Sequence, residues 1–143
     1  MNGKCFVDTN VLMYAHDAAA GWKQTVAQEL IARLWAAGTG VLSTQVLQEL
    51  CVSVRRRTTS SSPLNEARRV IEVYLSWQIV INTPASIVEA LRLESRYRIS
   101  FWDALIVQAA EQGGAAILYS EDLSNGQKYG SVRVVNPFAR SSS

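Results

Sequence analysis

Hydrophobic positions along the chain follow two patterns in turn. Short apolar runs rich in Val, Ile, Leu and Tyr predict β-strands at residues 4–7, 40–42, 78–81, 115–119 and 131–135. Between these runs, apolar residues recur every three to four positions, which is the spacing of a helix with one buried side. Strands that alternate with helices are typical of an α/β domain. We therefore expect a single, mostly parallel, five-stranded sheet covered by helices.

Residues that start or stop helices bound the helical stretches. The first predicted helix includes Val26 to Trp35 and stops at Gly38, and the second runs from Thr44 into an arginine triplet at 55–57. A Ser- and Pro-containing segment, 60–63, breaks the second helix. Three further helices are predicted at residues 65–77, 86–96 and 101–112. The chain shows no internal repeat.

The length and composition fit one domain. The chain has 143 residues, of which 48% are apolar and 18% charged, and chains of about 100–200 residues usually build a single core. We assign residues 1–138 to this domain and expect a disordered tail at 139–143, where little apolar surface is available for packing.

Cysteine usage and hydropathy predict a cytoplasmic protein. Cys5 and Cys51 lie at apolar positions and need not pair, which suits a reducing compartment. The longest stretch without charge, 73–88, has 16 residues, fewer than the roughly 18–20 apolar residues that span a bilayer. We expect no signal peptide and no membrane segment.

Several kinds of chemistry are excluded. One histidine, His16, and two distant cysteines cannot build a zinc site of four nitrogen and sulfur ligands or a two-histidine mechanism. Neither a Gly-x-x-x-x-Gly-Lys loop nor a Gly-x-Gly-x-x-Gly or Gly-x-Ser-x-Gly motif occurs. We expect His16 and Asp17 to form a surface pair without a catalytic role.

Three of the four aspartates lie where predicted elements meet. Asp8 directly follows the first strand, Asp122 follows the fourth, and Asp103 lies in the first turn of the last helix. Carboxyl ends of parallel strands meet at one edge of the sheet, where α/β proteins bind ligands. Glu49 lies in the second predicted helix, which starts near the same edge. Together these four carboxylates predict an acidic pocket.

Each acid also has a simpler interpretation when taken alone. Asp8 can cap the helix that follows it, and Asp103 can complete a capping box with Ser100. Asp122 can belong to a turn, and Glu49 can be solvated. Clustered carboxylates, however, repel one another and take up protons or recruit a divalent ion. Oxygen ligands alone favour Mg²⁺ or Mn²⁺, as one ion or a pair, and these ions can support phosphodiester hydrolysis.

Four segments, in order along the chain, resemble the PIN-domain family, specifically the VapC-type toxin ribonucleases of bacterial toxin–antitoxin pairs. They are FVDTNVL at 6–12, STQVLQE at 43–49, FWDALI at 101–106 and LYSEDLSNG at 118–126. The resemblance implies that Asp8, Glu49, Asp103 and Asp122 are the catalytic metal ligands, that Thr9 supports the site by hydrogen bonding, and that Asn10 lies at its edge, where substrate binds. Either Glu121 or Asp122 can face the pocket, and the family pattern favours Asp122.

The resemblance also implies an α/β/α sandwich, a Mg²⁺- or Mn²⁺-dependent endoribonuclease, a homodimer and inhibition by a small VapB-like antitoxin. Two alternatives remain open. One is a catalytically idle PIN-like module that binds RNA or protein. The other is a phosphatase of the haloacid-dehalogenase type, although that family places a second aspartate where this chain has Asn10.

Basic residues outside the acidic pocket are candidates for RNA binding. The net charge is +2, and with the four site acids set aside 14 basic residues face eight acidic ones, leaving +6. We expect Arg92, Arg96 and Arg98 to bind substrate, because the arginine fork suits phosphate. The triplet at 55–57 has two interpretations: RNA binding, and a solvated helix end that offsets the helix dipole, which we favour. The four tryptophans, Trp22, Trp35, Trp77 and Trp102, are expected to anchor the core or an interface rather than to stack on bases.

Overall fold

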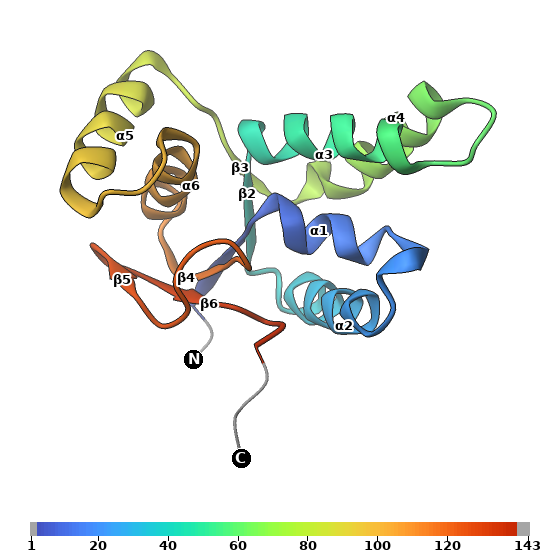
Figure 1. Cartoon of the computed structure of the whole chain (residues 1–143), viewed down its shortest axis with the longest axis horizontal. Coiled ribbons are helices and arrows are strands. Elements are labelled where there is room, and N and C mark those ends of the chain that lie inside the picture. The colour runs from blue at the N-terminus through green and yellow to red at the C-terminus, as the bar shows by residue number, and fades with distance from the viewer. Residues whose placement is uncertain (1–2, 140–143) are drawn as a thin grey trace.

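One sheet of six strands forms the centre of the computed structural model, which describes residues 3–139 (Figure 1). The strand order is β3-β2-β1-β4-β6-β5. The strands are β1 (Lys4–Val7), β2 (Gly40–Ser43), β3 (Gln78–Val80), β4 (Ala115–Tyr119), β5 (Lys128–Tyr129) and β6 (Val132–Val135). All neighbours are parallel except β5 and β6, which pair antiparallel. The prediction of five strands missed β5, because two residues are too short to produce a periodic signal.

Helices cover both sides of this sheet, so the expected α/β/α arrangement is confirmed. They are α1 (Thr9–Ala15), α2 (Trp22–Ala37), α3 (Thr44–Arg57), α4 (Pro63–Val73), α5 (Pro84–Tyr97) and α6 (Phe101–Gln112), with short 3-10 helices at Ala18–Ala20 and Tyr74–Ser76. In Figure 1, α5 and α6 lie to one side of the strands and α1 to α4 to the other. Among the described helices, none has the length and apolar character needed to cross a membrane.

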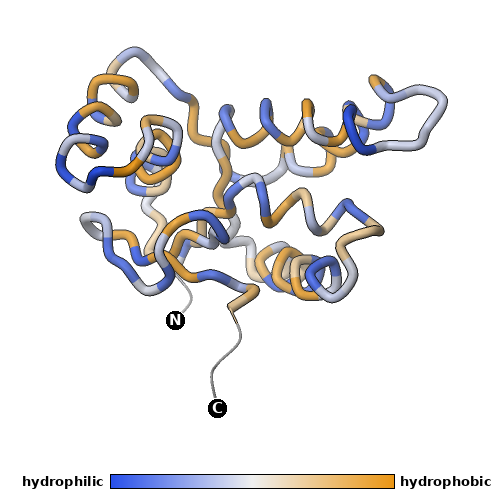
Figure 2. Tube along the Cα trace, viewed as in Figure 1, coloured by the Kyte–Doolittle hydropathy of each residue, from blue (hydrophilic) through white to orange (hydrophobic). Residues whose placement is uncertain are grey.

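The core explains why the buried strands are continuous apolar runs. All four residues of β2 are buried, because helices cover a parallel sheet on both faces. Figure 2 shows hydrophobic residues on the central strands, whereas α3 and α4 alternate between hydrophilic and hydrophobic residues. Gly40 opens β2 against the Trp77 ring, and a Cβ atom there would lie 2.3 Å from a ring carbon. Cys5 and Cys51 are free thiols, as expected.

Some predicted boundaries are wrong for reasons of packing. The helix predicted at 65–77 ends at Val73 and continues as the 3-10 helix Tyr74–Ser76, which turns Tyr74 and Trp77 into the core edge-to-face. The strand predicted to reach Ile81 ends one residue earlier, and Ile81 is 65% exposed. Of the predicted tail, Ala139 donates its N–H to the carbonyl of Asn136, and residues 140–143 lie outside the described residues.

Only one of the four tryptophans belongs to the core. Trp77 is 9% exposed, whereas Trp22, Trp35 and Trp102 are 42% exposed or more. Trp35 nevertheless contacts the rings of Tyr74 and Trp77 at the edge of the core. The expectation of a core anchor is therefore confirmed for Trp77, and an interface role for the three exposed tryptophans stays a prediction.

The strand order places a crevice beside β1 and β4. From β1 the chain progresses to β2 and β3 on one side, whereas β4 and β6 lie on the other side. Loops after β1 and β4 therefore leave in opposite directions and open a crevice at the carboxyl edge of the sheet, the position at which α/β folds bind ligands. The N–H of Asp8 donates to the carbonyl of Tyr119 at 2.9 Å, so the two strand ends are joined there.

Candidate active site

Asp8 both caps a helix and faces the crevice. It is the N-cap of α1 and follows β1 directly, and one carboxylate oxygen, Oδ1, accepts the N–H of Thr9 at 2.7 Å. The other oxygen, Oδ2, accepts the hydroxyl of Ser120 at 2.8 Å and the amide of Asn10 at 3.5 Å. The capping interpretation is therefore confirmed for Oδ1, and Oδ2 is left to the contacts of the candidate site.

Burial controls the charge of Asp8. The residue is only 5% exposed, and this desolvation raises the pKa of Asp8 to about 7; hydrogen bonds from Ser120 and Thr9 oppose the rise, and the charges of Asp122 and Glu49 add to it. Near neutral pH the carboxyl group is thus close to half protonated in the protein alone. This is the behaviour expected of a carboxyl group that is removed from water, with a smaller addition from the neighbouring acids.

Asn10 joins two of the predicted acids. Its side-chain amide donates to Asp122 Oδ2 at 3.0 Å, and its carbonyl accepts the N–H of Glu121 at 3.2 Å. Ser120 contributes a second link, because its hydroxyl oxygen accepts the N–H of Asp122 at 3.2 Å. Residues more than one hundred positions apart are therefore held in one network at the ends of β1 and β4.

The structure distinguishes Glu121 from Asp122. The Glu121 carboxylate accepts the Tyr14 hydroxyl at 2.6 Å and the Lys23 ammonium at 2.5 Å. Although burial raises the pKa of Glu121, the bonds from Lys23 and Tyr14 outweigh that effect and hold the pKa below its usual value. Glu121 therefore faces α1 and α2, whereas Asp122 faces Asn10.

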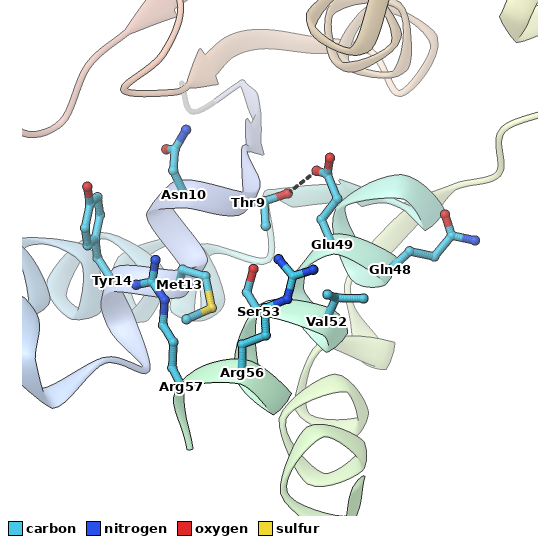
Figure 3. Close-up of a pocket in the computed structure, with 10 residues that line it drawn as sticks. All are labelled: Thr9, Asn10, Met13, Tyr14, Gln48, Glu49, Val52, Ser53, Arg56 and Arg57. Atoms are coloured by element: carbon cyan, nitrogen blue, oxygen red, sulfur yellow. Dashed lines mark hydrogen bonds between the residues drawn. The ribbon is translucent and has the colours of Figure 1, made fainter. Parts of the chain in front are cut away.

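Glu49 reaches the same edge from α3. Its carboxylate accepts the hydroxyl of Thr9 at 2.7 Å, as the dashed line in Figure 3 shows. The side chain is exposed, as a solvated glutamate would be, but this bond connects it to the residue beside Asp8. Thr9 is thus placed to orient Glu49.

Asp103 lies in the first turn of α6. The N–H of Asp103 donates to the Ser100 hydroxyl at 3.0 Å, so Ser100 is the N-cap of α6. This bond is one of the two that the predicted capping box would contain. Partial burial raises the pKa of Asp103, Ser100 lowers it, and the charge of Asp122 raises it further. The charge of Asp122 also raises the pKa of Asp8. Asp122 therefore repels both Asp8, at the end of β1, and Asp103, in α6.

The available ligand atoms suit a hard divalent cation. Carboxylates of Asp8, Glu49, Asp103 and Asp122 supply oxygen only, the ligand type that Mg²⁺ and Mn²⁺ prefer. Within residues 3–139, no group of three His, Cys, Asp or Glu residues lies close enough together to form a complete ligand set. The buried Asp8, whose pKa is raised by desolvation and further by the charges of Asp122 and Glu49, is the observation that fits a cation at this edge.

A groove runs from this edge between α1 and α3. Its volume is about 550 Å³, and it is lined by Thr9, Asn10, Met13, Tyr14, Gln48, Glu49, Val52, Ser53, Arg56 and Arg57 (Figure 3). Two arginines of the triplet at 55–57 therefore line a groove next to Glu49. All three arginines are exposed in the last turn of α3, as expected of a solvated helix end, and Arg56 and Arg57 in addition line this groove.

The predicted substrate arginines lie elsewhere. Arg92 pairs with Glu89 at 3.2 Å, Arg96 lies 5.2 Å from the centre of the Tyr97 ring, and Arg98 ends α5 with a positive φ of 56°. Among the described residues, neither a hydrogen bond nor an ion pair links these arginines to the four acids. The structure does not bring them together with the acidic site.

His16 and Asp17 do not form the expected surface pair. The Nε2 atom of His16 lies 2.7 Å from the Tyr74 hydroxyl, and burial lowers the pKa of His16. Asp17 instead pairs with Arg57 at 3.0 Å. Neighbours in sequence thus take different partners, because adjacent residues at a helix end point in different directions.

Sequence analysis missed one residue of the site, Ser120, and treated RNA binding by the triplet that contains Arg56 only as the second interpretation. Ser120 is fully buried and contacts both Asp8 and Asp122. A small polar residue at the end of an apolar strand is a weak sequence signal for a residue of a functional site. For Arg56, the spacing of seven from Glu49 in one helix places both on one side.

Comparisons with known proteins agree with this geometry. The PIN domain family matches residues 5–124, a range that contains all four acids. The fold is similar to that of VapC20 of Mycobacterium tuberculosis, a sarcin-ricin loop cleaving toxin, with a TM-score of 0.65 and 21% identity over 83% of this chain and 90% of that chain. Among curated proteins, none matches the chain. Because the family match covers most of the sequence, the chain belongs to the PIN domain family.

Proposed function

We propose that this protein is a divalent-metal-dependent endoribonuclease that hydrolyses RNA phosphodiester bonds, the toxin of a VapBC-type pair. One observation carries the proposal: the buried carboxylate of Asp8 is joined through Asn10 and Ser120 to Asp122, where the loops after β1 and β4 diverge. Membership of the PIN domain family and the similarity in fold to VapC20 support it. We assign residues 1–138 to the nuclease domain.

The four acids have separate tasks in this proposal. Asp8, Asp103, Asp122 and Glu49 would hold Mg²⁺ or Mn²⁺, which when bound activates water and neutralises the charge that develops on the phosphate. Asn10 and Ser120 orient Asp8 and Asp122 by hydrogen bonds, and Thr9 orients Glu49. Oriented ligands of this kind hold a metal more tightly than free ones.

Partners and location follow from the proposed class of toxin. We infer a small VapB-like antitoxin that inhibits the enzyme and a homodimer as its assembly. The free thiols of Cys5 and Cys51 suit a reducing compartment, and we propose a cytoplasmic location. The haloacid-dehalogenase alternative is wrong, because the chain belongs to the PIN domain family.

Cleavage of defined RNAs tests this function. The wild-type protein, Asp8→Asn and a control, Glu72→Gln, are incubated with RNA in Mg²⁺, in Mn²⁺ and in EDTA. Glu72 is an exposed carboxylate that pairs with Arg68 on α4, so the control makes the same chemical change away from the site. We expect cleavage by the wild type and Glu72→Gln only with metal.

The Asp8→Asn protein should lose on the order of a thousandfold in rate, because a bound metal contributes several kcal/mol to the transition state. Asn retains the ability to cap α1, so the variant should fold. Cleavage that continues in EDTA, or an active and folded Asp8→Asn protein, would contradict the proposal. A wild-type protein that binds RNA without cutting it would support the idle-module alternative instead.

A further inference from the structure

The groove between α1 and α3 carries opposite charges at its two ends. Glu49 lies at the end next to Thr9, and Arg56 lies seven residues further along the same helix. Seven residues of α-helix correspond to about 10.5 Å along the axis. Positions 49, 52, 53 and 56 lie on one side of α3, so Val52 and Ser53 line the groove between the two charges.

The three arginines at the end of α3 differ in their surroundings. Arg57 is paired with Asp17 at 3.0 Å, and Arg55 is exposed and lies outside the groove lining. Arg56 lines the groove, is exposed, and in residues 3–139 has no ion-pair partner. Figure 3 shows its side chain rising from α3 on the side where Thr9 and Glu49 lie. Arg56 is thus the guanidinium available to a ligand in the groove.

The lining of the groove is suited to a nucleic-acid strand. A planar guanidinium binds phosphate oxygens with two parallel hydrogen bonds. Val52, 42% exposed, and Met13 form apolar walls beside this charge, and proteins that bind single strands combine a basic groove with surfaces for the bases. An acidic peptide has no comparable reason to approach Glu49 and Asp8, whereas the phosphate to be cut approaches them together with a cation.

We propose that this groove binds single-stranded RNA as it leaves the acidic site, with Arg56 contacting a backbone phosphate near the scissile one. The proposal rests on the proposed nuclease function and adds a path and a positively charged contact for the substrate. Arg56 acts in substrate binding and contacts a neighbouring phosphate, not the reacting one. Its contact is therefore present before and during the reaction, which affects binding rather than the chemical step.

Arg56→Gln, compared with the control Arg55→Gln, tests the proposal. Both variants remove one positive charge from the same helix end. We expect Arg56→Gln to raise KM for a short single-stranded RNA about tenfold, since a charged hydrogen bond is lost, and to leave kcat within about twofold. The slope of log affinity against log salt concentration should become shallower by about 0.7, the value for one phosphate of a single strand.

One further variant sharpens the test. Arg56→Lys retains charge and loses the planar fork, so its KM should lie between those of the wild type and Arg56→Gln. Circular dichroism and thermal denaturation establish that each variant is folded. Equal KM values and equal salt slopes for Arg55→Gln and Arg56→Gln would overturn the inference, as would an Arg56→Gln defect confined to kcat.

The outcomes separate the inference from the proposed function. If the wild type cleaves RNA with metal and Arg56→Gln binds RNA normally, the groove assignment is wrong and the nuclease remains. If the wild type cuts no RNA while Arg56→Gln still weakens RNA binding and Arg55→Gln does not, the nuclease assignment fails and the groove remains. If Arg56→Gln weakens binding of a protein partner and leaves RNA binding unchanged, the groove belongs to the partner and the proposal is overturned.

Discussion

The two sides of the candidate active site are built in different ways. On the strand side, Asp8 and Asp122 follow β1 and β4 and are joined by Asn10 and Ser120 through hydrogen bonds of 2.8–3.5 Å. On the helix side, Glu49 has one bond, to Thr9, and Asp103 lies in the first turn of α6, whose N-cap is Ser100. Among the described residues, hydrogen bonds therefore join the two acids of the strand side into one network, and no such network joins Glu49 to Asp103.

This difference has a physical consequence for metal binding. A network of several bonds positions the strand-side carboxylates in the protein alone, so little order has to be gained when a cation binds. On the helix side, Glu49 accepts one bond, from Thr9, and the charge of Asp122 raises the pKa of Asp103. On the proposed function, the helix-side carboxylates would become ordered when a cation is bound, whereas the strand-side carboxylates are already in place.

The largest expected effect concerns Asp8 and pH. Its folded pKa of about 7 lies above the ordinary value of 3.8, so between these pH values the folded protein holds a proton that the unfolded chain has released. Unfolding then releases that proton, and the free energy of unfolding in EDTA should fall as pH rises from about 4 to about 7. The slope should approach 1.4 kcal/mol per pH unit, as measured by urea denaturation.

Asp8→Asn should remove this contribution to the slope, since an amide does not titrate in this range. The variant should be at least as stable as the wild type at pH 8 without metal, because it lacks the repulsion from Asp122 and Glu49. Identical pH slopes for the two proteins would show that Asp8 ionises normally and that the strand side is not a site of repulsion.

Asn10→Ala tests whether the network orients the metal ligands. Removal of the bridge between Asp8 and Asp122 should weaken Mn²⁺ binding about 10–100-fold, the usual effect of losing a residue that holds a ligand. Isothermal titration calorimetry measures the affinity. Asn136→Ala is the control, because Asn136 bonds near the C-terminus and not at the site. Unchanged Mn²⁺ affinity in Asn10→Ala would mean that the bonds of Asn10 do not orient the metal ligands.

Two variants separate the capping role of Ser100 from the proposed ligand role of Asp103. Ser100→Ala removes the N-cap of α6 and should cost about 0.5–2 kcal/mol of stability, with or without metal. Asp103→Asn keeps the N–H that bonds to Ser100 and should instead lose stabilisation by Mg²⁺, which is a binding effect. Thermal denaturation in EDTA and in Mg²⁺ measures both. A full Mg²⁺-dependent rise in Tm for Asp103→Asn would remove Asp103 from the ligand set.

The smallest expected effect comes from Lys23, which contacts the strand side only through Glu121. Lys23→Met removes one of the two bonds that hold Glu121, so the pKa of Glu121 should rise and the Tm should fall slightly. Mn²⁺ affinity should change less than in Asn10→Ala, since Tyr14 still holds Glu121. Lys128→Met, on β5, is the matched control. A loss of affinity as large as that of Asn10→Ala would place Glu121 among the ligands.

Prediction from sequence succeeded where a signal is local and strong. The bounds of β1, β4 and α6 agree with those predicted, because each has a clear apolar period and a clear stop. It was less accurate at the 3-10 helix Tyr74–Ser76, where Tyr74 and the following Trp77 turn into the core, and it missed β5, which depends on pairing with β6. Tertiary packing decides such short elements.

The sequence by itself determined the succession of strands and helices along the chain and the place of each acid at the end of a strand or in a helix that starts at the same edge. Those features depend on residues within a few positions of one another. Only the tertiary structure decided that Asp122 faces Asn10 while Glu121 faces Lys23, and that Ser120 joins two acids. It also decided that Arg56 of α3 lines one groove with Met13 of α1. These choices join residues up to 112 positions apart, and strand order and helix packing, not local spacing, bring such residues together.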